Sequence, residues 1–80
     1  MRWQPSLTAH ELTALRLLAR GLHHTEIASV LGVRPETAGR LLHRAQIGLL
    51  ARTLAHAVAC GYETGLLTPP PPGLGPVDHP

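Results

Sequence analysis

Arginine and histidine side chains recur at helical spacing in the middle of the sequence, where they form a set of hydrogen-bond donors. Arg40 and Arg44 are four residues apart and His43 lies between them, so all three share one face of a helix. A guanidinium group donates two parallel hydrogen bonds to a phosphate, or to the O6 and N7 atoms of guanine. An imidazole donates to either kind of acceptor. These residues therefore favour hydrogen bonding to anionic groups or base edges.

Those side chains reach solvent together only if a helix holds them on its outer face. Helix start and stop signals divide the sequence into four segments. Thr8 and Glu11 have the spacing of a capping box, while Pro35 suits a first helical residue and Thr53 an N-cap. Leucine and alanine repeat at intervals of three and four residues within the segments. We therefore expect helices at about 9–20, 24–31, 35–50 and 54–63.

Composition and length favour one small all-α domain. Hydrophobic residues make up 44% of the 80 residues, but they are mainly leucine, alanine and valine, with no phenylalanine. Branched aliphatic side chains at helical spacing suit a compact four-helix bundle better than a sandwich or a barrel. We expect a lead at 1–6, the helical domain at 7–67 and a Pro/Gly-rich disordered tail at 68–80. Trp3 is expected to cap one end of the core.

The segments 24–31 and 35–50 have the pattern of a helix-turn-helix. Gly32, Val33 and Arg34 form a tight turn between them, and Val33 is placed to anchor this turn in the core. In this motif the second helix enters the major groove of double-stranded DNA, where its outward residues meet base edges and phosphates. The DNA-binding residues that we predict are Arg34, Glu36, Thr37, Gly39, Arg40, His43, Arg44 and Arg52.

Two simpler explanations of the arginines stay open at this point. The formal net charge is only +2, and an outer helix face with solvated arginines needs no ligand. All seven basic residues are arginine, which suits bidentate contacts but also fits a GC-rich coding bias. Helical periodicity alone does not choose between DNA binding and a solvated surface.

The last segment, 54–63, is apolar almost all round, although it is short. One side of such a helix covers its own domain, so the remaining apolar surface predicts a protein interface. We expect another protein chain to cover this surface. The interface residues that we predict are Leu54, Ala55, Val58, Cys60 and Tyr62.

Other chemistry finds little support in the sequence. The histidines and Cys60 lack the spacing of a zinc site, and we find no phosphate-cradling glycine loop, paired carboxylates or serine nucleophile motif. We therefore expect no enzymatic activity, no metal and no cofactor. A single cysteine favours a reducing compartment, and no segment has the pattern of a signal peptide or a membrane span. We expect a cytoplasmic chain without a membrane partner.

Two stretches, LTAHELTALRLLARGLHHTEIASVLGVRPETAGRLLHRA and AHAVACGYETGLL, carry a set of motifs in one register. The positions that match are Leu7, Thr8, Glu11, Leu15, Ala19, Gly21, Glu26, Ile27, Ala28, Leu31, Gly32, Thr37, Ala57, Val58, Gly65, Leu66 and Leu67. Together they resemble, without a gap, the DNA-binding domain of bacterial LuxR-type (GerE-type) transcription regulators. No receiver or ligand-binding domain precedes them in the sequence, so we expect a stand-alone domain of this type.

The resemblance implies a sequence-specific transcription regulator. It implies that the third helix reads the major groove and that the fourth helix dimerises. It places base contacts at Gly39, Arg40 and His43, and a backbone contact at Thr37. It also places the start of the second helix near a phosphate.

Some positions depart from the family pattern and leave alternatives open. A basic residue is usual where this chain has Gly48, and an arginine is usual where it has Leu54. A domain that has lost these phosphate contacts would bind RNA polymerase or another regulator instead of DNA. The stretches EIASVLGV and RLLHRAQIGLL also resemble region 4 of extracytoplasmic-function sigma factors, which binds promoter DNA with the same kind of helix pair.

Overall fold

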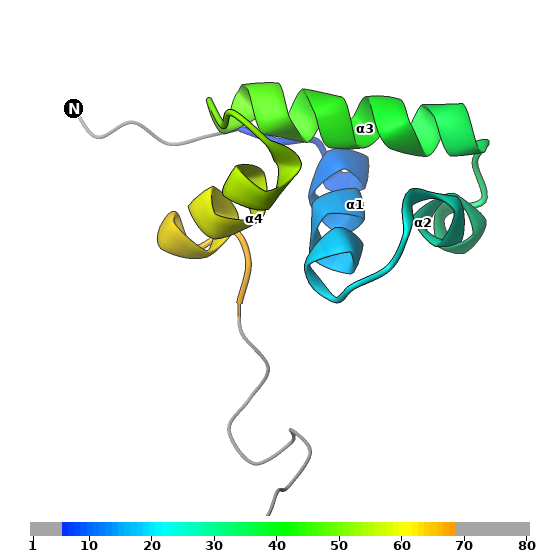
Figure 1. The fold of residues 1–80 in the computed structure, drawn as a ribbon, viewed down its shortest axis with the longest axis horizontal. Helices are drawn as coiled ribbons and strands as arrows, with labels where there is room; N and C mark the ends of the chain where they lie inside the picture. The colour runs from blue at the N-terminus through cyan, green and yellow to red at the C-terminus, as the bar shows by residue number, and fades with distance from the viewer. Residues whose placement is uncertain (1–5, 69–80) are drawn as a thin grey trace, which may run out of the picture.

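The computed structural model describes residues 6–68, and within this range the chain forms four helices and no strand. In chain order these are α1 (Ala9–Ala19), α2 (His24–Leu31), α3 (Pro35–Gly48) and α4 (Leu54–Glu63). The predicted all-α fold is confirmed. α3 lies across the other three helices and contacts each of them (Figure 1). The predictions for Trp3 and for residues 69–80 lie outside the described residues.

Side-chain hydrogen bonds hold the starts of α1 and α2. At α1 the predicted capping box is confirmed, because Thr8 N–H donates to Glu11 Oε1 at 3.0 Å and Glu11 N–H donates to Thr8 Oγ1 at 3.1 Å. A similar arrangement begins α2, where His23 N–H donates to Glu26 Oε1 at 2.7 Å and Thr25 N–H donates to His23 Nδ1 at 3.5 Å. Both carboxylates therefore hold backbone groups of their own helix.

A residue with positive φ, in the left-handed region, follows each of the first three helices, and the chain changes direction there. Gly21 and Gly32 follow α1 and α2 with φ of 95° and 71°, as glycines at these positions predict. The end of α3 differs from the prediction, because the helix stops at Gly48 and not at residue 50. Glycine is a weak helix former, and the turn that follows puts Leu50 in the left-handed region with φ 57°. Leu50 N–H donates to the carbonyl oxygen of Ile47 at 3.0 Å, which closes the helix end.

Two hydrophobic clusters form the core, and α3 contributes to both. The first joins α1, α2 and α3 through Ala14, Ile27, Ala28, Ala38 and Leu42. The second joins α1, the end of α3, α4 and the segment after it through Leu15, Ala45, Leu49, Ala57 and Leu67. Val33 packs against the first cluster, as predicted for the anchor of the turn. The inner side of α3 is therefore fixed along its whole length.

The left-handed Leu50 generates a stability prediction. A side chain costs about 1–2 kcal/mol in this conformation, and glycine recovers most of that at an entropic cost of roughly 0.5–1 kcal/mol. Since Leu50 is 72% exposed, its replacement removes little packing. We expect Leu50→Gly to raise the melting temperature by about 3–6 °C in thermal unfolding followed by circular dichroism.

The matched control is Gly21→Ala, at another left-handed position where an added Cβ has no atom within 4 Å. This variant is expected to lower the melting temperature, because it introduces the strain that Leu50→Gly removes. A lower melting temperature for Leu50→Gly would contradict the account of this helix end.

Candidate nucleic-acid interface

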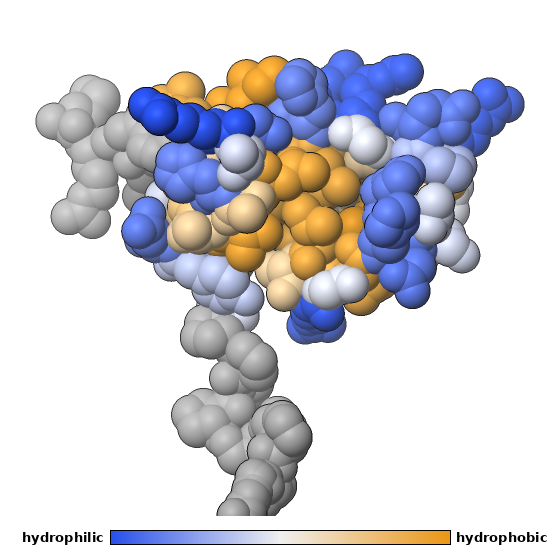
Figure 2. Space-filling model, in the orientation of Figure 1, coloured by the Kyte–Doolittle hydropathy of each residue, from blue (hydrophilic) through white to orange (hydrophobic). Residues whose placement is uncertain are grey.

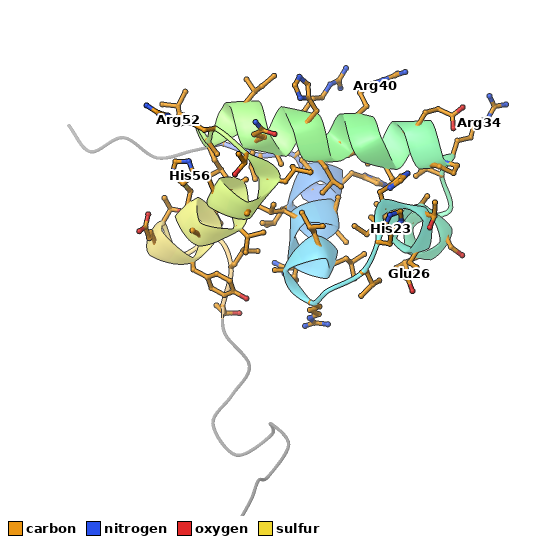
Figure 3. The ribbon with its side chains drawn as sticks, viewed as in Figure 1. His23, Glu26, Arg34, Arg40, Arg52 and His56 are labelled. Carbon is orange, nitrogen blue, oxygen red and sulfur yellow. The ribbon has the colours of Figure 1, made fainter. Side chains whose placement is uncertain are left out.

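The outer side of α3 carries the side chains that the sequence places on a nucleic-acid surface. Ala38, Leu42 and Ala45 face the core and are buried, whereas Arg40 and His43 lie on the opposite side and are exposed. Figure 3 shows Arg40 directed away from the other helices. The helix thus separates a packing stripe from a stripe of hydrogen-bond donors.

The structure brings the predicted DNA-binding residues to one helix and its two ends. The exposed ones are Arg34, Glu36, Arg40, His43, Arg44 and Arg52, and the partly exposed ones are Thr37 and Gly39. Arg34 is the N-cap of α3 and Arg52 follows its C-terminal turn, so the two lie at opposite ends of the helix (Figure 3). Because α3 has 14 residues, cationic groups are distributed over roughly 20 Å of helix.

Negative charge is scarce along this part of the chain. No aspartate or glutamate occurs between residues 37 and 62, while this stretch contains Arg40, Arg44 and Arg52. Glu36 is the one acidic residue in the predicted set, and its place in the first turn complements the helix dipole. The outer side of α3 beyond this first turn is therefore positively charged.

The first turns of α2 and α3 differ in the groups that an anion would meet there. α3 has no side-chain cap and begins with Pro35, which has no N–H, while the N–H groups of Thr37 and Ala38 donate to the carbonyl oxygen of Arg34 at 3.0 Å. In this first turn Glu36 N–H is left to donate to a phosphate oxygen. At α2 the carboxylate of Glu26 already accepts from His23 N–H. A phosphate at the start of α2, where the family resemblance places one, meets this negative charge.

A hydrogen-bonded turn holds Arg52 at the start of α4. Arg52 N–H donates to His56 Nδ1 at 3.1 Å, and His56 N–H donates to Thr53 Oγ1 at 3.0 Å (Figure 3). Thr53 is the N-cap that the sequence predicts, but the part played by His56 was missed. The signal was present, because His56 has the same spacing from Thr53 as Glu11 has from Thr8.

The two neutral positions that depart from the family pattern lie against apolar side chains of the domain. A Cβ added at Gly48 would lie 2.7 Å from Leu7 Cδ2, the far end of a flexible side chain, so the Leu7 side chain must shift to admit it. Leu54 is partly buried and packs against the first hydrophobic cluster. Leu54 therefore has a packing role that sequence reasoning did not find, and Gly48 lies beside the side chain of Leu7.

The residues predicted for a dimer interface fall into two groups on α4. Leu54, Val58 and Cys60 are partly buried against the domain's own core, whereas Ala55 and Tyr62 are exposed. Ala59, which the sequence prediction did not include, is also exposed. It lies four residues after Ala55 and three before Tyr62, so these three share one side of the helix. We call Ala55, Ala59 and Tyr62 the α4 stripe.

Comparisons with known proteins give no family assignment for this chain. No protein-family model matches the chain, and no curated protein matches it either. Among residues 6–68, no group of three or more histidine, cysteine or acidic side chains is arranged to hold a metal ion. No helix in the described part of the chain is long and apolar enough to span a bilayer.

Proposed function

We propose that this domain is a sequence-specific DNA-binding transcription regulator with α3 as its recognition helix. The observation that carries the proposal is the exposed Arg40–His43–Arg44 group on the outer side of α3, which no acidic residue interrupts. A helix of this kind is about 10–12 Å across, which suits a major groove about 12 Å wide. The buried inner stripe supports this role, because it holds the donors on a rigid element.

In this proposal the side chains divide into those that select bases and those that hold the backbone. Arg40 and His43 contact base edges, with the guanidinium of Arg40 donating to O6 and N7 of one guanine. Arg34, Arg44 and Arg52 contact phosphates on either side of the groove. The hydroxyl of Thr37 and the N–H of Glu36, in the first turn of α3, bind a further phosphate.

The proposed class is a LuxR-type regulator in the cytoplasm. Its support is the resemblance of residues 7–67 together with four helices in the expected order. The packing of Leu54 against the core also supports it, because this departure need not mark a lost DNA-binding surface.

Two substitutions separate base selection from backbone binding. We expect Arg40→Ala to cost about 1–3 kcal/mol on the preferred duplex and to relax preference at one base pair. Arg44→Ala should weaken binding to all duplexes by a similar factor, because phosphates occur in every sequence. Affinities from fluorescence anisotropy on a panel of single-base variants measure both effects.

Arg20→Ala is the matched control, since Arg20 is exposed at the end of α1 and lies outside the predicted interface. It is expected to leave both affinity and preference unchanged. If Arg40→Ala also leaves them unchanged, α3 is not the recognition helix.

We further propose that the domain binds DNA as a homodimer through the α4 stripe. Small residues at Ala55 and Ala59 permit close approach of a second helix, and Tyr62, which is 41% exposed, supplies aromatic surface. A two-fold dimer presents two copies of α3 to two half-sites. The partly buried Leu54, Val58 and Cys60 pack against the core and hold α4 on the domain.

A charge placed in the α4 stripe tests the dimer. Ala59→Glu is expected to convert the dimer to a monomer in sedimentation analysis, because burying an unpaired carboxylate is costly. Val30→Glu, at a position on α2 that is 61% exposed, should leave the dimer intact. A dimer that persists in Ala59→Glu would assign the interface to another surface.

A further inference from the structure

The outer side of α3 changes character toward its C-terminal end. Ile47 is 58% exposed and Leu50 is 72% exposed. Ile47 lies three residues after Arg44 and so on the same side of the helix, and Leu50 is hydrogen-bonded to the Ile47 carbonyl oxygen. Figure 2 shows hydrophobic surface on the outer side of α3 here, with hydrophilic surface on either side of it. We call Ile47 and Leu50 the apolar pair.

Leu50 combines exposure with backbone strain. Its φ of 57° is a conformation that glycine or asparagine adopts at lower cost, and its side chain gains little from burial in the domain. Backbone strain that is held in place by the surrounding fold is concentrated at functional positions. A leucine that is both strained and exposed is therefore better explained by a contact outside the domain than by folding.

Cationic side chains flank the apolar pair on both sides. Arg44 precedes it and Arg52 follows it, and both are exposed. The absence of aspartate and glutamate between residues 37 and 62 leaves these charges without an acidic neighbour in sequence. DNA phosphates satisfy the arginines, but they do not bury two aliphatic side chains. A protein segment with an apolar centre and acidic edges satisfies both.

We propose that the apolar pair, with Arg44 and Arg52, is a docking surface for an acidic amphipathic helix of another protein. Apolar residues of that helix cover Ile47 and Leu50, while its carboxylates pair with the two arginines. This surface lies at the opposite end of α3 from the turn that begins the proposed recognition helix. The inference goes beyond DNA binding, and it shares Arg44 and Arg52 with the phosphate contacts of the proposed function.

A designed peptide provides the first test. The probe is a fluorescently labelled helical peptide with leucines at positions i, i+3 and i+7 and glutamates on both flanks. Two control peptides of equal length replace its leucines with serines or its glutamates with lysines. Fluorescence anisotropy with the full chain is expected to show binding of the probe and of neither control.

Substitutions in the protein then locate the site. Ile47→Ser and Leu50→Gly are each expected to weaken probe binding at least about tenfold, as for a central contact residue. Arg52→Ala should weaken it by a smaller factor and reduce its salt dependence. The matched controls Val30→Ser and Arg20→Ala remove an equally exposed apolar residue and an arginine from other helices, and should leave binding unchanged.

Leu50→Gly is the most informative variant, because we expect it to stabilise the domain while it removes probe binding. Loss of binding then cannot result from unfolding. The proposal is overturned if the probe does not bind, if the serine peptide binds equally well, or if Val30→Ser has the same effect as Leu50→Gly. It is also overturned if Leu50→Gly abolishes self-association in sedimentation, since a second copy then covers the apolar pair.

Discussion

The packing of α3 against every other helix is the constraint on which the rest of the structure depends. Ala38, Leu42, Ala45 and Leu49 lie along its inner side and belong to two separate hydrophobic clusters. Since one cluster fixes each half of the helix, α3 cannot rotate about its axis without opening part of the core. The same packing leaves its outer side to solvent, so whatever binds there meets side chains on a rigid support.

Along its length, α3 first presents a polar, cationic surface and then an apolar one. Its first part combines an uncapped start with the exposed donors of Arg40 and His43, which suits polar acceptors on DNA. Its last part exposes Ile47, and the turn that follows the helix exposes Leu50, which suits apolar side chains. Arg44 lies between the two surfaces, so a DNA ligand and a protein ligand can both use its charge. The two proposed surfaces are therefore neighbours along the helix and share Arg44 and Arg52.

The sequence predicted the helices well because local signals determine them. The capping box of Thr8 and Glu11, the N-cap Thr53 and the glycines after α1 and α2 are all readable from residue type and spacing. The end of α3 was predicted too late, since periodicity does not reveal that Leu50 adopts a left-handed turn.

The outward placement of Arg40 and His43 also followed from helical period, whereas the reasons for other site features are tertiary. Gly48 lies against Leu7, and Leu54 packs on the core, although both resemble lost phosphate contacts in the sequence. Such contacts join segments distant in the chain, and no single stretch encodes them.

The most direct test of the central claim, that α3 binds DNA through its outer cationic side, is the salt dependence of binding to a random-sequence duplex. The full chain is titrated into labelled duplex at several salt concentrations. A plot of log affinity against log salt with a slope of about −3 or steeper is the predicted result, because several phosphates are neutralised together. Absence of binding even at low salt would contradict the claim.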